Sequence, residues 1–529
     1  MKKRIYIFDT TLRDGAQTSG IDFSLADKQA IAAALDGLGV DYVEGGWPGA
    51  NPTDDRFFEA DPAFRNAKFT AFGMTRRPGR SADNDPGLNA LIGSSASVIT
   101  LVGKSWDYHV DLALEIPRAE NLAMIGDSIQ QVVANKKEAI FDAEHFFDGY
   151  KANPDYAYAC VKAAFDHGAA WLVLCDTNGG SQPHEIEQIV GEIIQKMPDA
   201  KFGIHAHNDT EQAVANSIAA VRAGATQVQG TINGLGERCG NANLMSLIPN
   251  LQLKHGYDCG FDAASLSKLT HISRLLDERL NRNPNRHLPY VGDGAFAHKG
   301  GLHVSAVSKD PKTYEHIDPS LVGNRRHIVV SDQAGRSNVQ SQLANAGIEL
   351  NKQETDSLLG ELKSLEHQGY SFDGAEASFE LLALKALGKR KQFFEIERFR
   401  VIDERRVSAL NEVITESEAT VWVKHHGHSM LQVAMGTGPV HAIDNAIRNM
   451  LSMIYPCLAT MTLIDYKVRI LPPSTTKTGT ESITRVNIES KDHAGNRWLT
   501  VGVSDNIIAA SVQALCDAID YKLIMLNDQ

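Results

Sequence analysis

The chain has few cysteines, no long apolar run and no excess of basic residues, and each absence excludes a class of protein. Six cysteines among 529 residues show neither metal-ligand nor disulfide spacing, which is typical of a protein from a reducing cytoplasm. No apolar run approaches the ~20 residues of a membrane span, and Met1-Lys2-Lys3-Arg4 leads into a strand pattern rather than a signal peptide. The formal charge of −13, from 52 basic and 65 acidic residues, argues against nucleic-acid and membrane-surface partners.

The first half of the chain alternates between short apolar runs and helical patterns. The predicted strands are Arg4–Phe8, Asp41–Glu44, Lys68–Phe72, Val98–Val102, Ala139–Asp142, Trp171–Cys175, a run opening at Phe202, and Gln227–Thr231. Helical patterns fill most of the gaps, at Ala26–Leu38, Asp155–His167, Glu185–Met197 and Glu211–Ala223. Eight strand–helix units in about 250 residues predict an α/β fold of the (β/α)8 TIM-barrel type. A doubly wound open sheet is the alternative, and eight units favour closure.

The run His205-Ala206-His207-Asn208-Asp209 follows the seventh predicted strand. Side chains two apart in a strand point to the same face, so His205 and His207 are expected to converge. Two converging imidazoles suit a divalent metal that takes further ligands from elsewhere in the chain. A hydrogen-bonded histidine pair without a metal is the structural alternative.

Barrel closure places the first strand beside the eighth, which supplies oxygen ligands. Asp14 follows the first predicted strand and Asn241 the eighth, so both join the two histidines at the C-terminal rim, where barrel enzymes build their sites. This set contains no thiolate and predicts Mg²⁺ or Mn²⁺, with Zn²⁺ as a third option. Open coordination positions would let a substrate bind the metal directly. The same geometry brings Glu144 and Thr177 to the rim, after strands five and six.

Three separated motifs carry a resemblance that covers essentially the whole chain. Asp9–Gly15 (DTTLRDG), His205–Asp209 (HAHND) and Gly234–Asn241 (GLGERCGN) resemble the defining motifs of the DRE-TIM metallolyase superfamily. This superfamily includes isopropylmalate, homocitrate and citramalate synthases and hydroxymethylglutaryl-CoA lyase. Further details, at 45–49, 142–149 and 175–180, most resemble the bacterial citramalate synthase type, which joins pyruvate to acetyl-CoA at the start of a threonine-independent isoleucine route.

The resemblance implies roles for three rim residues. Arg13 would hydrogen-bond the keto oxygen of the substrate and stabilise the developing alkoxide, since its guanidinium stays charged. Thr177 would bind the keto-acid carboxylate. Glu144 matches the family's catalytic carboxylate, which takes part in removing a proton from the acetyl methyl group, in relay with a histidine or water.

A further motif follows the predicted barrel. Residues 296–303 (FAHKGGLH) resemble the synthases' linker motif, which makes His303 the catalytic histidine delivered into the partner subunit's active site, with Tyr314 near the substrate. His298 has a catalytic and a structural interpretation. Val304-Ser305 stands where relatives carry an aspartate, so the acyl-CoA contact of that aspartate is not carried over.

The C-terminal part changes character. Leu358, Leu359, Leu362 and Leu365 have the spacing of an amphipathic helix within a connector from Asp332 to Leu387. Strands are predicted at Phe393–Val401, Ala419–Val423 and Leu431–Met435, and helices at Ala442–Tyr455 and Ile508–Leu523, which suggests a pseudo-repeat. The pattern resembles the regulatory domain of isopropylmalate synthases, which dimerises and binds the end-product amino acid. A purely structural dimerisation module is the alternative.

The predicted domains are a barrel at 1–270, helical linker subdomains at 271–390 and a regulatory or dimerisation domain at 391–529. The predicted activity is a metal-dependent Claisen condensation of acetyl-CoA with pyruvate and hydrolysis of the thioester, in a cytoplasmic homodimer or higher homo-oligomer inhibited by isoleucine. Isopropylmalate or homocitrate synthesis is the nearest alternative. The lyase, a metal-dependent TIM-barrel hydrolase and a non-catalytic amino-acid-binding protein fit the motifs less well. Cys239, in the third motif, is expected to be a packing residue.

Overall fold

The computed structural model describes residues 2–60, 62–298, 301–328, 350–372, 374–407, 413–471 and 482–527, together with Val339, Leu343 and Ile348. The chain forms two compact units, which are described separately. The first contains Met1–Phe296 and Ile317–Arg326, and the second contains Ala297–His316 and His327–Gln529.

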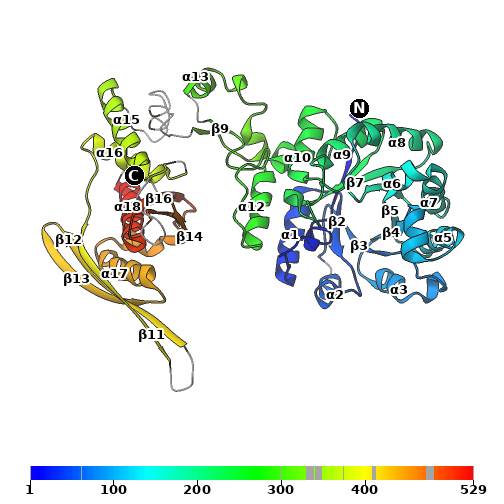
Figure 1. The fold of residues 1–529 in the computed structure, drawn as a ribbon, viewed down its shortest axis with the longest axis horizontal. Helices are drawn as coiled ribbons and strands as arrows, with labels where there is room; N and C mark the ends of the chain where they lie inside the picture. The colour runs from blue at the N-terminus through cyan, green and yellow to red at the C-terminus, as the bar shows by residue number, and fades with distance from the viewer. Residues whose placement is uncertain are drawn as a thin grey trace. The chain divides into compact units, whose positions relative to one another are not determined.

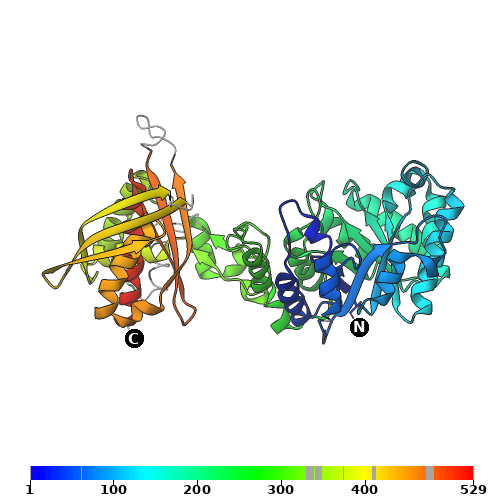
Figure 2. The same ribbon diagram turned by 90° about the horizontal axis from the view of Figure 1, so that it is seen from below.

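The first unit is a closed barrel of eight parallel strands surrounded by helices (Figure 1, Figure 2). The strands are β1 (Tyr6–Asp9), β2 (Tyr42–Gly46), β3 (Lys68–Met74), β4 (Val98–Lys104), β5 (Glu138–Glu144), β6 (Trp171–Asp176), β7 (Phe202–Ala206) and β8 (Gln227–Gly230). β1 pairs in parallel with both β2 and β8, so that Tyr6 lies opposite Gln227. The predicted TIM barrel is therefore confirmed, and the open sheet is excluded.

The outer helices begin and end at residues with the expected capping chemistry. Ser24 and Asp27 form a capping box at the start of α1 (Leu25–Leu38), and Gly39 ends this helix in the left-handed conformation at φ 97°. Proline occupies the first turn of four others, where its missing N–H has no helical partner to lose: α2 (Pro52–Glu59), α3 (Pro86–Gly93), α7 (Pro154–Asp166) and α8 (Pro183–Lys196). The remaining main helices are α5 (Arg118–Ala134), α6 (Phe146–Ala152), α9 (Ala213–Ala223), α10 (Leu244–Pro249) and α12 (Leu269–Arg279).

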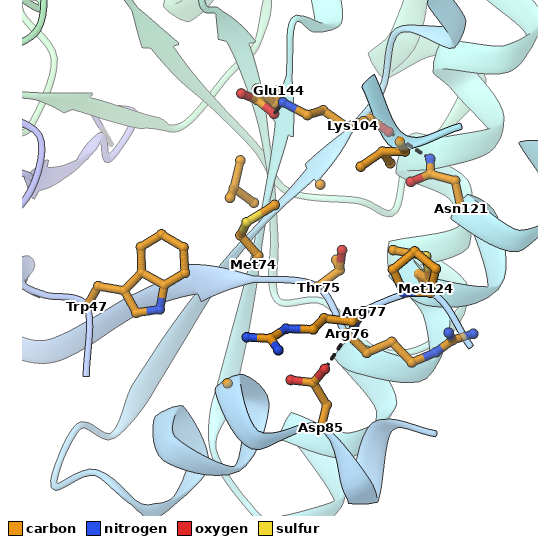
Figure 3. Close-up of a pocket in the computed structure, with 15 residues that line it drawn as sticks. Trp47, Met74, Thr75, Arg76, Arg77, Asp85, Lys104, Asn121, Met124 and Glu144 are labelled. Carbon is orange, nitrogen blue, oxygen red and sulfur yellow. Dashed lines mark hydrogen bonds and ion pairs between the residues drawn. The ribbon is translucent and has the colours of Figure 1, made fainter. Parts of the chain in front are cut away.

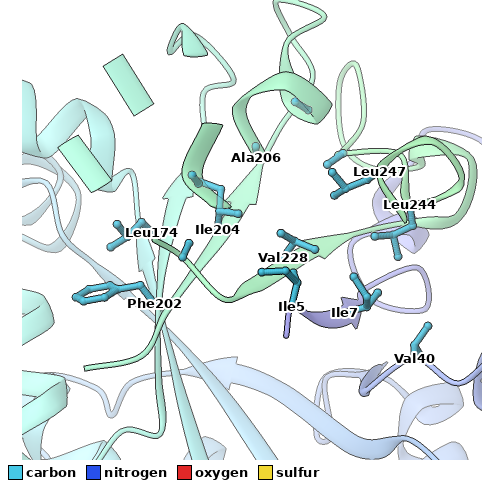
Figure 4. Close-up of a cluster of buried hydrophobic side chains, with 14 of the residues drawn as sticks. Ile5, Ile7, Val40, Leu174, Phe202, Ile204, Ala206, Val228, Leu244 and Leu247 are labelled. Atoms are coloured by element: carbon cyan, nitrogen blue, oxygen red, sulfur yellow. The ribbon is translucent and has the colours of Figure 1, made fainter. Parts of the chain in front are cut away.

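A hydrophobic cluster fixes the strands that carry the predicted metal ligands. Figure 4 shows Ile7 of β1, Ile204 of β7 and Val228 of β8 beside Leu244 and Leu247 of α10. All five side chains are fully buried. Burial of each such side chain contributes about 1.5–3 kcal/mol, so the ends of these neighbouring strands are held firmly in register.

The second unit contains two halves of similar build. The first half consists of the antiparallel strands β11 (Glu395–Val407), β12 (Val413–His425) and β13 (His428–Gly436), followed by α17 (Pro439–Ile454). The second consists of β14 (Thr462–Ile470), β15 (Thr484–Lys491) and β16 (Arg497–Ser504), followed by α18 (Ile507–Asn527). The predicted pseudo-repeat is therefore present, with longer strands than the sequence indicated.

Shorter elements precede these halves in the second unit. β9 (Ala297–His298) pairs with β10 (His327–Ile328), and α13 (Gly301–Lys309), α15 (Lys352–His367) and α16 (Glu376–Ala386) follow β9 along the chain. Much of the first part of the predicted connector, within 332–349, lies outside the described residues. Across the described part of the chain, none of the helices combines the length and apolarity needed to cross a bilayer.

Candidate active site

Three predicted metal ligands meet at the C-terminal rim of the barrel. Their ligand atoms all lie within 4.8 Å of one another, and all three residues are buried. Asp14 Oδ2 is 3.3 Å from Nε2 of His205 and 3.9 Å from Nε2 of His207. The two Nε2 atoms are 3.4 Å apart. The alternation of side chains along a strand thus brings the two imidazoles to one point, as the sequence predicted.

Asn241, the fourth predicted ligand, lies beside His207. An isolated antiparallel β-bridge pairs its backbone with that of His207. Its Nδ2 donates to the carbonyl of Leu235 at 3.1 Å. A Cβ atom at Gly236 would lie 2.1 Å from this Nδ2, so only glycine permits the approach. Oδ1 of Asn241 and Oδ1 of Asp14 are buried and have no hydrogen-bond partner among the described residues. Because an unpaired buried acceptor is costly, these two oxygens fit a bound cation.

Burial and neighbouring charges shift the pKa values of all three residues in the cluster. Burial acts to raise the pKa of Asp14, but the positive charge of Arg13 and contact with His205 outweigh it and hold this pKa well below its usual range. Burial, and then the neighbouring His205, lower the pKa of His207 to about 4. At neutral pH Asp14 is therefore a carboxylate and His207 an uncharged imidazole, which are the forms that bind a divalent cation. Burial acts to lower the pKa of His205, but its contact with Asp14 outweighs burial and raises this pKa, so a metal ion would displace a proton from that ring.

Arg13 is fixed beside the cluster by two carboxylates and a ring. Its Nε donates to Glu44 Oε2 at 2.7 Å, and Nη1 donates to Asp14 Oδ2 at 3.1 Å. The guanidinium carbon lies 3.9 Å from the centre of the Phe72 ring. The hydroxyl of Thr10 also donates to Glu44 Oε2, at 2.6 Å. These contacts hold a permanent positive charge in a fixed position next to the predicted metal ligands.

Thr177 lies directly after β6. Its hydroxyl oxygen accepts a hydrogen bond from the backbone N–H of His145 at 2.9 Å. The hydroxyl proton is not used in that bond, so it can be donated to a ligand carboxylate. The carbonyl of Thr177 accepts from Arg238 Nη2 at 2.6 Å, which ties this loop to the loop after β8.

Glu144 ends β5 and borders a cavity over the ends of β3, β4 and β5. Its carboxylate forms an ion pair with Lys104 of β4. Figure 3 shows this pair on one wall of the cavity, with Trp47 and Met74 on another. The other lining residues include Thr75, Arg76, Arg77, Asp85, Val102, Leu114, Asn121 and Met124. The cavity is largely apolar, and two of its three cations are paired with carboxylates, Lys104 with Glu144 and Arg76 with Glu120 and Asp127. Its shape and apolar lining suit an extended ligand.

The two predicted residues beyond the barrel stack on each other in the second unit. The rings of His303 and Tyr314 lie 4.0 Å apart at 24°. His303 is exposed, and Tyr314 is 48% exposed. His298 is buried, and its Nε2 lies 3.2 Å from Glu315 Oε1, which supports its structural interpretation.

The prediction that Cys239 is a packing residue is wrong. Its side chain is exposed on the loop after β8.

Three buried polar residues inside the barrel were missed by sequence reasoning. Glu44 holds Arg13, Gln229 contacts the predicted metal ligand His205, and Asp142 contacts Gln229. Burial raises the pKa of Asp142 to about 7. The signal that could have found them is a polar side chain within an otherwise apolar strand, at an alternate position that faces the barrel interior.

Comparison with known families covers most of the chain. A family model described as HMGL-like matches residues 4–275, a homocitrate synthase post-HMGL domain-like model matches 290–370, and the LeuA allosteric (dimerisation) domain model matches 373–523. The (R)-citramalate synthase of Aquifex aeolicus is 50% identical, with 99% of this chain and 98% of the relative covered. That of Synechocystis is also 50% identical, with 99% and 97% covered. The chain belongs to the citramalate synthase family.

Membership in the citramalate synthase family makes the protein a transferase of the acyl-condensing type. A probable 2-isopropylmalate synthase of Methanopyrus kandleri is 31% identical over 97% of this chain, so the wider family extends to that activity at lower identity. Members of the family generally depend on a divalent metal, and the cluster of Asp14, His205 and His207 has the residue types that such an ion requires.

Proposed function

We propose that this protein condenses acetyl-CoA with pyruvate and hydrolyses the thioester to (R)-citramalate, the first step of a threonine-independent isoleucine route. One observation carries the proposal: a buried set of metal-ligand residues lies beside a fixed Arg13, in a chain that matches (R)-citramalate synthases over almost its whole length. Mn²⁺ or Mg²⁺ is the proposed metal, since oxygen and imidazole ligands without thiolate suit these ions.

Each rim residue has a proposed part in the condensation. Asp14, His205, His207 and Asn241 would hold the divalent ion. When bound, this ion supplies Lewis-acid polarisation of the keto group. Thr177 would donate to the carboxylate of pyruvate, and Arg13 would donate to the keto oxygen, on which negative charge develops as the new carbon–carbon bond forms.

Glu144 and His303 would move the proton. A proton leaves the methyl group of acetyl-CoA through a relay of these two side chains, and the resulting carbanion attacks the keto carbon. Lys104 holds the Glu144 carboxylate at the rim. Water then cleaves the thioester, which releases the carboxylate product and the free thiol of coenzyme A. The cavity next to Glu144 is the proposed entrance for acetyl-CoA, and Tyr314 orients His303 by stacking on it.

A homodimer is part of the proposal, with His303 acting in the partner subunit's barrel. The match to a LeuA dimerisation domain at 373–523 supports it. So do the large apolar side chains exposed on four strands of that region, Ile402, Val407, Val413, Leu431, Val433, Met435, Ile464, Val468 and Ile470. The same domain would bind isoleucine as a feedback inhibitor. The six unpaired cysteines suit the proposed cytoplasmic location.

Steady-state kinetics with three keto acids test the proposal. Release of the coenzyme A thiol is measured with pyruvate, 2-ketobutyrate and 2-ketoisovalerate at saturating acetyl-CoA. Pyruvate should give the largest kcat/KM, with some turnover of 2-ketobutyrate, because one methylene changes discrimination by only about 10–200-fold. A clear preference for 2-ketoisovalerate would overturn the proposal in favour of isopropylmalate synthesis. Hydrolysis without any keto acid would favour the hydrolase alternative.

A further inference from the structure

Gln229 connects a proposed metal ligand with a buried carboxyl group on the far side of the barrel interior. It lies on β8 and is 1% exposed. Its Oε1 lies 2.9 Å from Nδ1 of His205 on β7, and its Nε2 donates to Oδ1 of Asp142 on β5 at 3.2 Å. Asp142 is 3% exposed. The three side chains therefore form a buried line of hydrogen-bonded groups, Asp142–Gln229–His205, that runs from β5 to the metal cluster.

The order of donors and acceptors along this line decides which imidazole nitrogen is free. An amide oxygen only accepts, so Nδ1 of His205 must carry the proton when it faces Gln229 Oε1. In the uncharged ring, which is the form that binds a metal, Nε2 then carries the lone pair, and this is the nitrogen that lies 3.3 Å from Asp14 and 3.4 Å from Nε2 of His207. The opposite tautomer would place a hydrogen on the nitrogen that the metal needs.

The amide of Gln229 has two orientations, and Asp142 distinguishes them. In the observed orientation the amide NH₂ group faces Oδ1 of Asp142, and the ionised form of this carboxyl group only accepts. The reversed orientation would bring Oε1 against Asp142 Oδ1, two acceptors at hydrogen-bond distance, and the NH₂ group against the protonated Nδ1 of His205. Because the line is buried, solvent does not relieve either conflict.

We propose that Asp142 fixes the amide orientation of Gln229, and that Gln229 in turn fixes the tautomer and ring plane of His205 for metal binding. Both are positioning residues: they act through His205 and reach the metal only by way of it. The inference deepens the proposed function because it rests on the metal site, but it makes no use of the keto acid or of acetyl-CoA. Hydrogen-bond partners of metal ligands typically change metal affinity by about 10–100-fold when they are removed.

Two near-isosteric variants test the two links separately. Gln229→Met removes the acceptor for His205 and keeps the volume. Asp142→Asn leaves a side chain that can donate or accept, so the amide of Gln229 is free to reverse. The matched control is Gln227→Met, because Gln227 is a buried glutamine two residues earlier on β8 whose amide atoms have no hydrogen-bond partner among the described residues.

The measurement is Mn²⁺ binding to the EDTA-stripped full-length protein, by titration with electron paramagnetic resonance of the free ion. It is made at pH 8, where the carboxyl of Asp142, with its pKa raised to about 7, is ionised. We expect Gln229→Met to raise the Kd for Mn²⁺ about 10–100-fold, Asp142→Asn to raise it less, and Gln227→Met to leave it unchanged. The double variant of Gln229 and Asp142 should bind no more weakly than Gln229→Met alone, because the second residue acts through the first.

Three results would overturn the inference. These are an unchanged Kd in Gln229→Met, an unchanged Kd in Asp142→Asn, and full additivity in the double variant. Circular dichroism establishes that each variant is folded. If Gln229→Met does not fold, the test is whether the Kd for Mn²⁺ of Asp142→Asn exceeds that of the Gln227→Met control. Loss of Mn²⁺ affinity in a protein that does not use pyruvate would uphold the inference while the proposed function fails. Wild-type affinity in a Gln229→Met protein whose parent condenses pyruvate would reject the inference alone.

Discussion

Arg238 holds Asp209 through two hydrogen bonds, from Nε to Oδ1 at 2.8 Å and from Nη2 to Oδ2 at 3.0 Å. The pair joins the loop after β7 to the loop after β8. Asp209 follows His207 by two residues, and Arg238 precedes Asn241 by three. The same Nη2 also donates to the carbonyl of Thr177. One guanidinium thus connects the loops that carry two proposed metal ligands and the proposed carboxylate contact.

Replacement of this guanidinium should loosen the metal site. We expect Arg238→Met to raise the Kd for Mn²⁺ by about 10-fold, at the low end of the usual range for partners of metal ligands, because Arg238 is partly exposed to solvent. KM for the keto acid should rise with it, since the Thr177 loop loses the same anchor. Arg222→Met is the matched control, because Arg222 also forms an ion pair, with Glu187, but on an outer helix of the barrel. An effect of equal size in both variants would contradict the prediction.

Metal removal should abolish turnover and lower stability. EDTA should stop thiol release, and Mn²⁺ or Mg²⁺ should restore it. Since the ion binds the folded chain, metal at 100 times its Kd should add about 2.7 kcal/mol to the unfolding free energy, visible as a rise in Tm. His207→Ala should lose both activity and the metal-dependent rise while staying folded. Full activity in the stripped enzyme would reject the proposed role of the cluster.

Mixed dimers test whether His303 acts in the partner's barrel. Arg13→Ala and His303→Ala homodimers should each be nearly inactive, because each lacks one catalytic group at every site. After dissociation and reassembly, a heterodimer should contain one site with both groups and one with neither. Activity per heterodimer should therefore reach at most half the wild-type value. If heterodimers form and no activity returns, His303 either serves its own barrel or takes no part in catalysis.

Isoleucine should inhibit through the C-terminal domain. Allosteric coupling of the usual size, about 1–3 kcal/mol, changes affinity roughly 5–150-fold and is readily measured. Calorimetric titration of the full-length protein with isoleucine, leucine and valine should show isoleucine as the ligand. Removal of the chain from Phe393 onward should abolish both binding and inhibition. Binding of leucine alone would indicate isopropylmalate synthesis, and binding of none of the three would favour a structural module.

The metal-free barrel should lose stability as the pH rises, in part because of Asp9. Burial, against the hydrogen bonds from Thr11, raises the pKa of this carboxyl to about 7. The folded chain therefore binds more protons than the unfolded chain between about pH 4 and pH 7, so the contribution of Asp9 to stability declines over that interval. Urea unfolding at pH 5 and pH 8 in EDTA should show a smaller decline for Asp9→Asn than for the parent. Equal declines would mean that Asp9 is ionised in the folded barrel.

The barrel and the metal cluster could be predicted because both follow from local patterns. Apolar runs alternate with helical patterns, and His205 and His207 are two residues apart at the end of one such run. Side-chain alternation and barrel closure then suffice to bring them to Asp14. Predicting this cluster therefore required no knowledge of contacts between individual side chains.

The supporting residues could not be predicted in the same way. Glu44, Asp142 and Gln229 are single polar residues inside apolar strands, and their partners lie on other strands. Which of them meet depends on side-chain length and direction inside the closed barrel, which the sequence pattern does not contain. The extent of β11 was underestimated for a related reason. Its last six residues, Ile402–Val407, include four charged side chains that interrupt the apolar alternation, and the strand continues because β12 pairs with it.

Closure of the barrel by β1 and β8 also sets the order of events as the chain leaves the ribosome. Asp14 emerges early with β1, whereas His205, His207 and Asn241 emerge only with the last two strands. Until β8 is made, β1 has one unpaired edge and the metal ligands are incomplete. If these residues bind the metal, we expect its capture to be a late event in biosynthesis, and we expect the nascent chain to expose strand edges open to aggregation until then. A chain stopped before Gln227 should bind no Mn²⁺ tightly and should need a chaperone to stay in solution.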